Sequence, residues 1–163
     1  MTPPPATDVP PRTHTCGELS AADDGAQVEA VMIPEEDRVT LCISTQVGCP
    51  LDCSFCATGS LGFTRNLRTA EIVDQLCRMR EVLPGGQRIT NIVFMGMGEP
   101  LANYDRVRES LRRLIDVGGM SARSVTVSTV GVVPGMLRLA EEPWPVYLAV
   151  SLHGADDETR SRL

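Results

Sequence analysis

Apolar and polar residues along this 163-residue chain follow two different periods, which predict strands and helices in turn. Partial alternation over residues 27–33 and the β-branched content of residues 39–44 predict two strands. The acidic turn at residues 34–37 would join them into a β-hairpin. Short apolar stretches predict three more strands, at residues 91–95, 124–129 and 146–150.

Helical periods fill the segments between these later strands. An apolar stripe within residues 72–83 predicts a helix, with Thr69 as its N-cap and Glu71 near its positive end. A second stripe at residues 107–115 predicts another helix, and residues 134–140 predict a short third one. This alternation indicates an α/β fold built from parallel βαβ units. Four such strands and three helices do not close a barrel.

The two ends of the chain differ from this pattern. Residues 1–24 are rich in Pro, Thr and Asp and lack apolar periodicity, which predicts a disordered leader. Residues 156–163 have the composition of the middle of a helix, without a cap or a stop signal. We therefore expect residues 25–163 to be the N-terminal part of a truncated domain, poorly folded without the remainder.

Composition narrows the setting. The net charge of −6 argues against a sequence-independent coat for nucleic acid, and the 42% hydrophobic content is enough for a core. The sequence shows no signal peptide and no apolar run long enough to cross a membrane. These features predict a cytoplasmic protein, and clustered cysteines in that reducing compartment more often bind metal or do chemistry than form disulfides.

Three cysteines crowd one short loop. Cys49, Cys53 and Cys56 are separated by three and then two residues, so a sharply folded loop could present all three thiols together. Zinc sites usually take four ligands in two separated pairs. Three thiolates on one loop suit an iron–sulfur cluster with one iron left open. The alternative is a group of buried structural thiols, which does not explain their position in a loop that contains Pro and Asp.

Gly98 and Glu99 follow directly after the strand predicted at residues 91–95. Ligands of α/β folds bind at the carboxyl ends of the strands, glycine allows close approach of the backbone, and a carboxylate can accept hydrogen bonds from an ammonium group. An ordinary strand-to-helix turn is the alternative, and the nearby cysteine loop favours the ligand interpretation.

Several stretches together resemble the RNA adenine carbon-2 methyltransferases of the RlmN type, a branch of the radical S-adenosylmethionine (SAM) enzymes. The resemblance covers residues 25–163 and rests on residues 40–49, with the cysteine loop and its aromatic Phe55, and on residues 62–67, 94–103, 127–129 and 151–153. It implies a partial (βα) radical SAM barrel preceded by a β-hairpin. It also implies a [4Fe–4S] cluster on Cys49, Cys53 and Cys56, with SAM chelating the open iron.

The resemblance implies further roles residue by residue. Contacts to SAM are implied for Gly98, Glu99, Ser128, Ser151, Leu152 and His153. Glu29 would remove the ring proton of the adenine, and Cys42 would attack a methylated cysteine, releasing product and leaving a disulfide. Taken without the resemblance, Glu29 is a solvated strand residue and Cys42 a small buried hydrophobe. The family's methyl-carrying cysteine matches none of the six cysteines in this chain.

The implied function is methylation of adenine carbon 2 in 23S rRNA and in some tRNAs. The implied partners are these RNAs, an external electron donor such as flavodoxin, and a fragment that supplies the C-terminal half. Three alternatives stay open: the sister group that methylates carbon 8, another radical SAM enzyme, and a non-enzymatic iron–sulfur module. In the last of these, Cys42 or His14 would provide the fourth cluster ligand.

Overall fold

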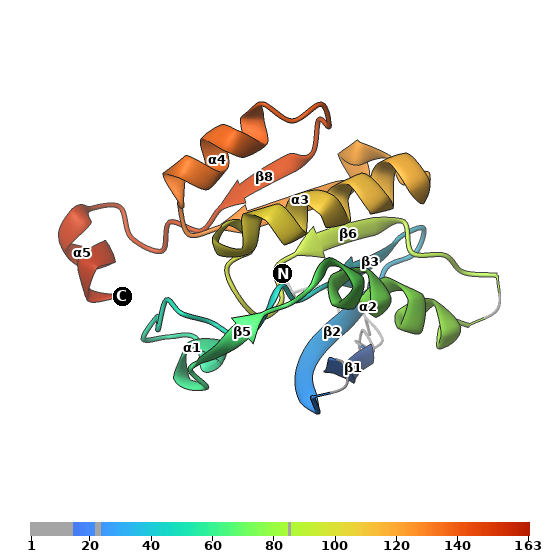
Figure 1. The fold of residues 1–163 in the computed structure, drawn as a ribbon, viewed down its shortest axis with the longest axis horizontal. Coiled ribbons are helices and arrows are strands. Elements are labelled where there is room, and N and C mark those ends of the chain that lie inside the picture. The colour runs from blue at the N-terminus through green and yellow to red at the C-terminus, as the bar shows by residue number, and fades with distance from the viewer. Residues whose placement is uncertain (1–14, 22–23, 85) are drawn as a thin grey trace, which may run out of the picture.

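The structure is a computed structural model that describes residues 15–21, 24–84 and 86–163. Its main feature is a six-stranded sheet with the order β1-β2-β3-β6-β7-β8 (Figure 1). The first three strands pair antiparallel, and β3, β6, β7 and β8 are parallel to one another. The strands are β1 (Thr15–Ala21), β2 (Ala26–Pro34), β3 (Val39–Cys42), β6 (Asn91–Phe94), β7 (Val125–Thr129) and β8 (Tyr147–Val150).

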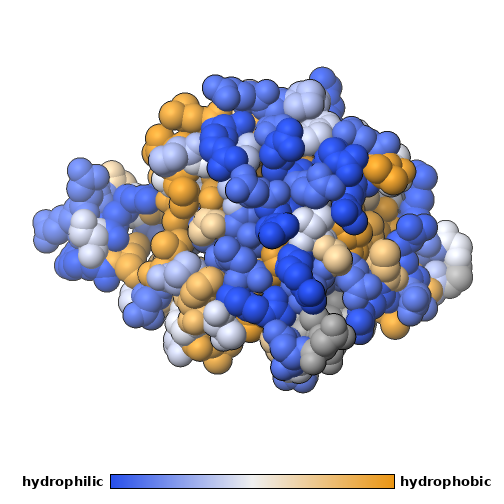
Figure 2. All heavy atoms as spheres, in the orientation of Figure 1, coloured by the Kyte–Doolittle hydropathy of each residue, from blue (hydrophilic) through white to orange (hydrophobic). Residues whose placement is uncertain are grey.

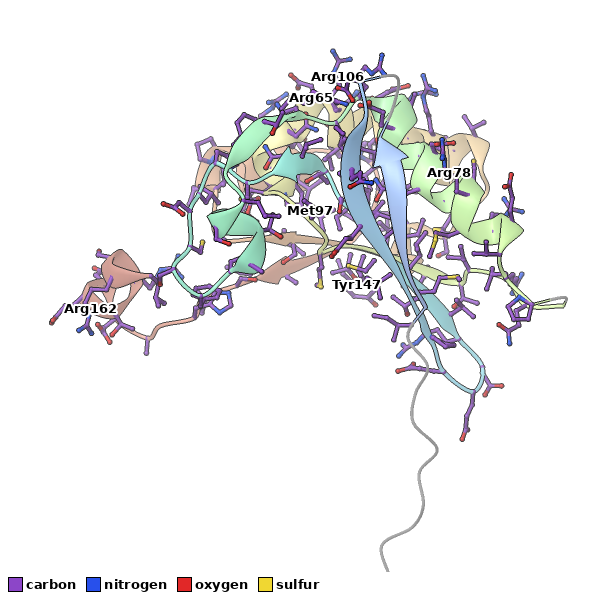
Figure 3. All side chains as sticks on the ribbon, turned by 90° about the horizontal axis from the view of Figure 1, so that it is seen from below. Arg65, Arg78, Met97, Arg106, Tyr147 and Arg162 are labelled. Atoms are coloured by element: carbon purple, nitrogen blue, oxygen red, sulfur yellow. The ribbon has the colours of Figure 1, made fainter. Side chains whose placement is uncertain are left out.

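Helices connect the parallel strands and pack on one side of the sheet (Figures 1 and 3). They are α2 (Thr69–Glu81), α3 (Tyr104–Arg112), which continues into a π-helical turn (Arg113–Val117), and α4 (Val133–Ala140). Short 3₁₀ turns lie at Pro100–Asn103 and Ala122–Ser124, and α5 (Asp157–Arg162) follows β8. The predicted α/β architecture, with a hairpin ahead of parallel βαβ units, is confirmed.

The core lies between this helical layer and one face of the sheet. Alternate strand residues point into it, among them Val28, Leu41, Phe94 and Val127, none of which is more than 2% exposed. Because side chains alternate along a strand, their neighbours form the opposite face, which no described helix covers. This open face carries Tyr147, whose side chain is 59% exposed.

A second, small sheet frames the cysteine loop and was not predicted. Strand β4 (Gln46–Gly48) pairs antiparallel with β5 (Phe63–Asn66), and α1 (Ala57–Ser60) lies between them. Three- and four-residue strands are too short to show a period of two, so nothing in the hydrophobic pattern marks them. Their pairing closes residues 49–62 into a separate loop.

Three sequence-based expectations need correction, one about the N-terminal residues and two about the starts of helices. Residues 15–21 form β1 and pair along β2, although they were assigned to a disordered leader; residues 1–14 lie outside the described residues. The backbone groups at the edge of β2 supply the partners for this pairing, whatever the side-chain period. Thr69 is the first residue of α2 rather than its N-cap, which is Arg68, whereas Glu71 does lie in the first turn. Asp156 caps α5 by accepting from the Thr159 amide at 2.8 Å, so this helix has a start signal.

The hydropathy of the surface varies across the face shown in Figure 2. Hydrophilic residues dominate the middle of the view, and hydrophobic ones gather beside α4 and towards α5 (Figure 2). The exposed apolar residues of this region include Leu137, Leu148, Val150 and Leu152, each at least 40% exposed. No helix among the described residues is long and apolar enough to span a membrane.

Candidate cofactor-binding site

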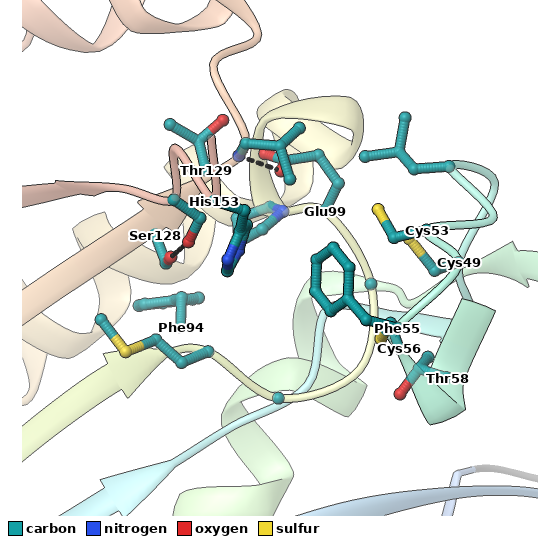
Figure 4. Close-up of a pocket in the computed structure, with 17 residues that line it drawn as sticks. Cys49, Cys53, Phe55, Cys56, Thr58, Phe94, Glu99, Ser128, Thr129 and His153 are labelled. Atoms are coloured by element: carbon teal, nitrogen blue, oxygen red, sulfur yellow. Dashed lines mark hydrogen bonds between the residues drawn. The ribbon is translucent and has the colours of Figure 1, made fainter. Parts of the chain in front are cut away.

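A pocket of about 300 Å³ lies where the carboxyl ends of β6, β7 and β8 face the cysteine loop (Figure 4). Its volume is at the lower end of the roughly 300–1,000 Å³ typical of small-molecule sites. Eight of the residues singled out from the sequence line it together: Cys49, Cys53, Cys56, Gly98, Glu99, Ser128, Ser151 and His153. In Figure 4 the cysteines lie on one side, Ser128 on the other, and Glu99 between them.

The cysteine loop is closed by backbone contacts at its base. The Cys49 amide donates to the Gly62 carbonyl at 3.0 Å. A Cβ on Gly48, whose φ is +76°, would lie 1.8 Å from that same carbonyl oxygen, so only glycine fits there. Asp52 turns the loop with a φ of +47°, a conformation that Asp tolerates better than most residues. The loop is therefore fixed in a shape that brings three thiols to one pocket.

The chemistry of this donor set fits a positively charged group. Burial raises the pKa of the Cys49 thiol. A hydrogen bond from the Leu51 backbone partly offsets this, while the neighbouring Cys53, Cys56 and Glu99 add to the rise. No Lys or Arg of the described residues lines the pocket, so holding three thiolates beside a carboxylate requires a bound cation. No three Cys, His, Asp or Glu side chains of the described residues converge to hold one metal ion. A cubane cluster does not need such convergence, because each cysteine binds a different iron.

Glu99 is almost fully buried, at 4% exposure, and its carboxylate joins two strand ends. One oxygen accepts from the Leu101 amide at 2.9 Å. The other accepts from the Val130 amide, also at 2.9 Å (Figure 4). A carboxylate has about four lone-pair positions, so each oxygen retains capacity for another donor at the pocket. Glu99 therefore fixes the loop after β6 to the loop after β7 and can still meet a ligand.

Ser128, Ser151 and His153 form the opposite wall. The hydroxyl oxygens of Ser128 and Ser151 lie 3.5 Å apart, across the β7–β8 pair. His153 adopts a φ of +54°, and its ring lies 4.6 Å from that of Phe55 in the cysteine loop, at 50° between the planes. Leu152 does not line this pocket. It borders an adjacent one with His153, and its side chain is 60% exposed.

Glu29 and Cys42 lie outside this pocket, on the open face of the sheet. Cys42 pairs with Val31 in the hairpin, and Glu29 lies two residues from Val31, so all three share one face. Burial raises the pKa of the Cys42 thiol, and a hydrogen bond from the Met95 amide partly offsets this. Glu29 is exposed, not buried as a general base would need to be, and its carbonyl accepts from the Ser44 hydroxyl at 2.7 Å.

Comparison with known proteins identifies the family. The model of the Radical SAM superfamily matches residues 43–163, most of the chain, including the whole cysteine loop. The chain belongs to the radical SAM superfamily. The cofactors of this family are a [4Fe–4S] cluster and SAM, in agreement with the prediction from the cysteine loop and with the donor set of the pocket.

Individual relatives of this radical SAM chain are RNA methyltransferases by name. It is 57% identical to the dual-specificity RNA methyltransferase RlmN of Syntrophobacter fumaroxidans over 86% of its own length and 41% of that protein. It is 53% identical to the probable dual-specificity RNA methyltransferase RlmN of Frankia alni over 95% of its length and again 41% of that protein. The chain thus spans about two-fifths of these relatives.

A solved structure agrees with this radical SAM assignment. The crystal structure of a radical SAM methyltransferase from Sphaerobacter thermophilus superimposes with a TM-score of 0.78 and 44% identity. The match covers 94% of this chain and 49% of that one. The partial radical SAM barrel expected from the sequence is confirmed.

The five cysteines whose side chains are described are all free thiols. The disulfide expected at Cys42 is therefore not supported by the structure. Cys42 also does not line the radical SAM pocket, which gives no support to its use as a fourth cluster ligand. His14, the other candidate for that place, lies outside the described residues.

Sequence reasoning missed the residues that hold this radical SAM site together. The Gln46 side-chain oxygen accepts from the Glu99 backbone amide. The side-chain NH₂ group of Asn103 donates to the carbonyls of Thr45 and Leu67, each at 2.9 Å. Arg160 donates to the Leu152 and Val130 carbonyls at 2.8 and 3.0 Å. The partners of each residue lie between 8 and 58 positions away, so no local pattern marks them.

Proposed function

We propose that this chain forms the cluster- and SAM-binding part of an RNA methyltransferase that modifies carbon 2 of adenine in 23S rRNA and in tRNA. The observation that carries the proposal is the meeting of three cysteines with Gly98, Glu99, Ser128, Ser151 and His153 at one pocket. The high identity to proteins named dual-specificity RNA methyltransferases supports RNA as the substrate.

Cys49, Cys53 and Cys56 would hold the cluster, and the remaining wall would hold SAM. When bound and reduced, the cluster supplies the electron that cleaves SAM. The unused lone pairs of the Glu99 carboxylate suit the ammonium group of SAM, while the Ser128 and Ser151 hydroxyls suit its carboxylate or ribose. His153 and Phe55 provide flat surfaces at the same pocket.

Glu29 and Cys42 would act on the RNA side. Their shared face is open in the described residues, which leaves room for a nucleotide and for further protein. Glu29 would accept the ring proton of adenine, and this requires that bound RNA or protein shields it from water. Cys42 would attack, as a thiolate, the sulfur of the carrier cysteine whose carbon is by then bonded to adenine. The S–S bond would form as the S–C bond breaks, and the electron pair would leave with that carbon, which takes up a proton to become the methyl group of the product.

The first test concerns the cofactors. Anaerobic reconstitution with iron and sulfide should give about four iron atoms per chain. SAM added to the reduced protein should change the electron paramagnetic resonance spectrum, because SAM reaches the open iron. Cys77→Ala is a control that should bind iron and respond to SAM like the wild type, because Cys77 is an exposed cysteine of α2 outside the pocket. A spectrum that stays unchanged at saturating SAM would support an electron-transfer module instead.

The second test concerns the product. With the remainder of the barrel present, the reconstituted protein should transfer a methyl group to an adenine of 23S rRNA fragments and of tRNA. Nucleoside mass spectrometry against 2-methyladenosine and 8-methyladenosine standards identifies the position. Methylation at carbon 8 would assign the chain to the sister group, and the absence of any methyl transfer would contradict the proposal.

A further inference from the structure

Gln46 occupies a central position between the two halves of the cofactor pocket. It lies in β4 at the base of the cysteine loop, and only 1% of its surface is exposed. Its side-chain NH₂ group donates to the Asn66 side chain at 2.7 Å, across the β4–β5 pair. Its side-chain oxygen accepts from the Glu99 backbone amide at 2.8 Å. One buried carboxamide therefore joins the frame of the cysteine loop to the loop that carries Glu99.

The loop after β6 is seated on β4 at this same place. The backbone amides of Thr45 and Gln46 both donate to the Met97 carbonyl, at 2.8 and 3.2 Å. Gly98 has a φ of +96°, and a Cβ there would lie 2.5 Å from the Cβ of Gln46. Glycine at position 98 thus allows the Gln46 side chain to reach the Glu99 amide.

The contact continues across the pocket from Glu99. The carboxylate of Glu99 accepts from the Val130 amide, and the Val130 carbonyl accepts from Arg160. A hydrogen-bonded series therefore runs from β5 through Gln46 and Glu99 to the ends of β7 and β8. Gln46 is its only described side-chain link between β4 and the Glu99 amide.

We propose that Gln46 is a positioning residue for SAM, which sets the distance between the Gly98–Glu99 loop and the cysteine loop. The inference rests on the proposed function, because it assumes that this pocket binds SAM. Gln46 does not line the pocket and acts through Glu99. Its loss should weaken SAM binding without preventing assembly of the cluster, whose three cysteine ligands stay in place.

The decisive variant is Gln46→Leu, which keeps the approximate size and removes both hydrogen bonds. Its affinity for SAM, measured by anaerobic titration of the reconstituted protein, should fall about tenfold, since the buried Glu99 amide loses its partner. Its iron content should match that of the wild type. Gln46→Glu keeps the acceptor for this amide, while Asn66 can turn its own amide to donate, so its affinity should stay within about threefold.

Gln75 offers a matched control. It is 2% exposed, and its carboxamide clamps the backbone of Ser44, with bonds of 2.8 and 2.9 Å. Gln75→Leu should lower the unfolding temperature as much as Gln46→Leu does and leave the SAM affinity nearly unchanged. Equal losses of SAM affinity in both variants would overturn the proposal, because the effect would then reflect general destabilisation.

The bond between Gln46 and the Glu99 amide can also be tested in the absence of SAM. Hydrogen exchange measured by mass spectrometry should show faster exchange in the peptide containing Glu99 in Gln46→Leu, and not in Gln46→Glu. If Gln46→Leu does not fold, Asn66→Ala decides the question, because Asn66 is exposed and its loss frees the Gln46 side chain. Asn66→Ala should speed the same exchange and weaken SAM binding about threefold, and wild-type behaviour in both measurements would overturn the proposal.

The two hypotheses fail in different ways. Absence of SAM binding by the wild-type protein would contradict the proposed function. Wild-type SAM affinity in Gln46→Leu, with normal binding by the wild type, would contradict only the role of Gln46.

Discussion

The cofactor pocket and the open face of the sheet differ in how their candidate functional residues are held. At the pocket, backbone and buried side-chain hydrogen bonds fix each wall, as the Gln46–Glu99–Val130 series shows. On the open face, Glu29 is exposed, and the Cys42 thiol has one hydrogen-bond partner among the described residues, the Met95 amide. The pocket is preorganised by residues of this chain, whereas the roles proposed for Glu29 and Cys42 would depend on bound RNA or further protein.

This difference has a physical basis. A cluster and SAM carry charge that must be met by groups fixed at short distances, and rigid backbone bonds provide this at little entropic cost. A residue that works on a large substrate can leave its final environment to the substrate. Variants of the pocket and of the open face should therefore separate cofactor binding from turnover.

The largest effect is expected at the cysteine loop. Cys53→Ala removes one of three thiolates and should reduce the bound iron from about four atoms per chain to nearly none. Iron analysis and the visible absorption of the reconstituted protein measure this. Cys42→Ala is the control from the open face and should retain the cluster. The reverse result, with iron lost only in Cys42→Ala, would show that the ligand assignment is wrong.

A large effect on turnover alone is expected at Glu29. Glu29→Gln keeps the shape and removes the basic carboxylate, so methyl transfer to RNA, measured with the remainder of the barrel present, should fall at least about a hundredfold. SAM affinity and iron content should be unchanged, because Glu29 lies outside the pocket. Normal turnover in this variant would exclude Glu29 as the base.

Cys42 should show its role through a trapped intermediate. With the remainder of the barrel and its methyl-carrying cysteine present, Cys42→Ala could not resolve the bond between that cysteine and the adenine, so a protein–RNA crosslink should accumulate. Denaturing gel electrophoresis with labelled RNA detects it. A fully active Cys42→Ala protein without crosslink would rule out the resolving role.

A moderate effect is expected on the reactivity of Cys42. Because burial raises its thiol pKa, less thiolate is present at neutral pH than in an unfolded chain. Alkylation of Cys42 by iodoacetamide should therefore be slower in the folded protein, and its rate should rise at higher pH than in denaturant. Peptide mass spectrometry measures both profiles. Coincident profiles would show that the folded environment does not shift this thiol.

The sequence was sufficient to predict the parts of the site that lie in compact motifs. One motif is the cysteine loop with Cys49, Cys53 and Cys56, and the other is the turn at Gly98–Glu99. Each motif spans only a few residues, and the residues of both line the pocket. The resemblance added Ser128, Ser151 and His153 to the same pocket, because the carboxyl ends of parallel strands meet at one edge.

The remaining parts depend on long-range pairing. Strand β1 exists by pairing with β2, and β4 and β5 are too short for a recognisable period. Gln46 is one polar residue in a stretch of mixed character, and its partner Glu99 lies 53 positions away. Only the three-dimensional arrangement shows that its side chain is buried, with a hydrogen-bond partner for both its oxygen and its nitrogen.

The smallest effect is expected at Arg160, at the far end of the hydrogen-bonded series. Arg160 is in α5 and donates to the Leu152 and Val130 carbonyls from its two terminal nitrogens. Arg160→Lys keeps the charge but cannot reach both carbonyls with the same fixed fork. SAM affinity should fall only about two- to threefold, because a carbonyl that loses its bond to Arg160 can accept from water instead. Arg162→Lys is the matched control in the same helix and should bind SAM like the wild type. A loss in Arg160→Lys as large as that in Gln46→Leu would mean that the β7–β8 end, rather than β4, sets the position of Glu99.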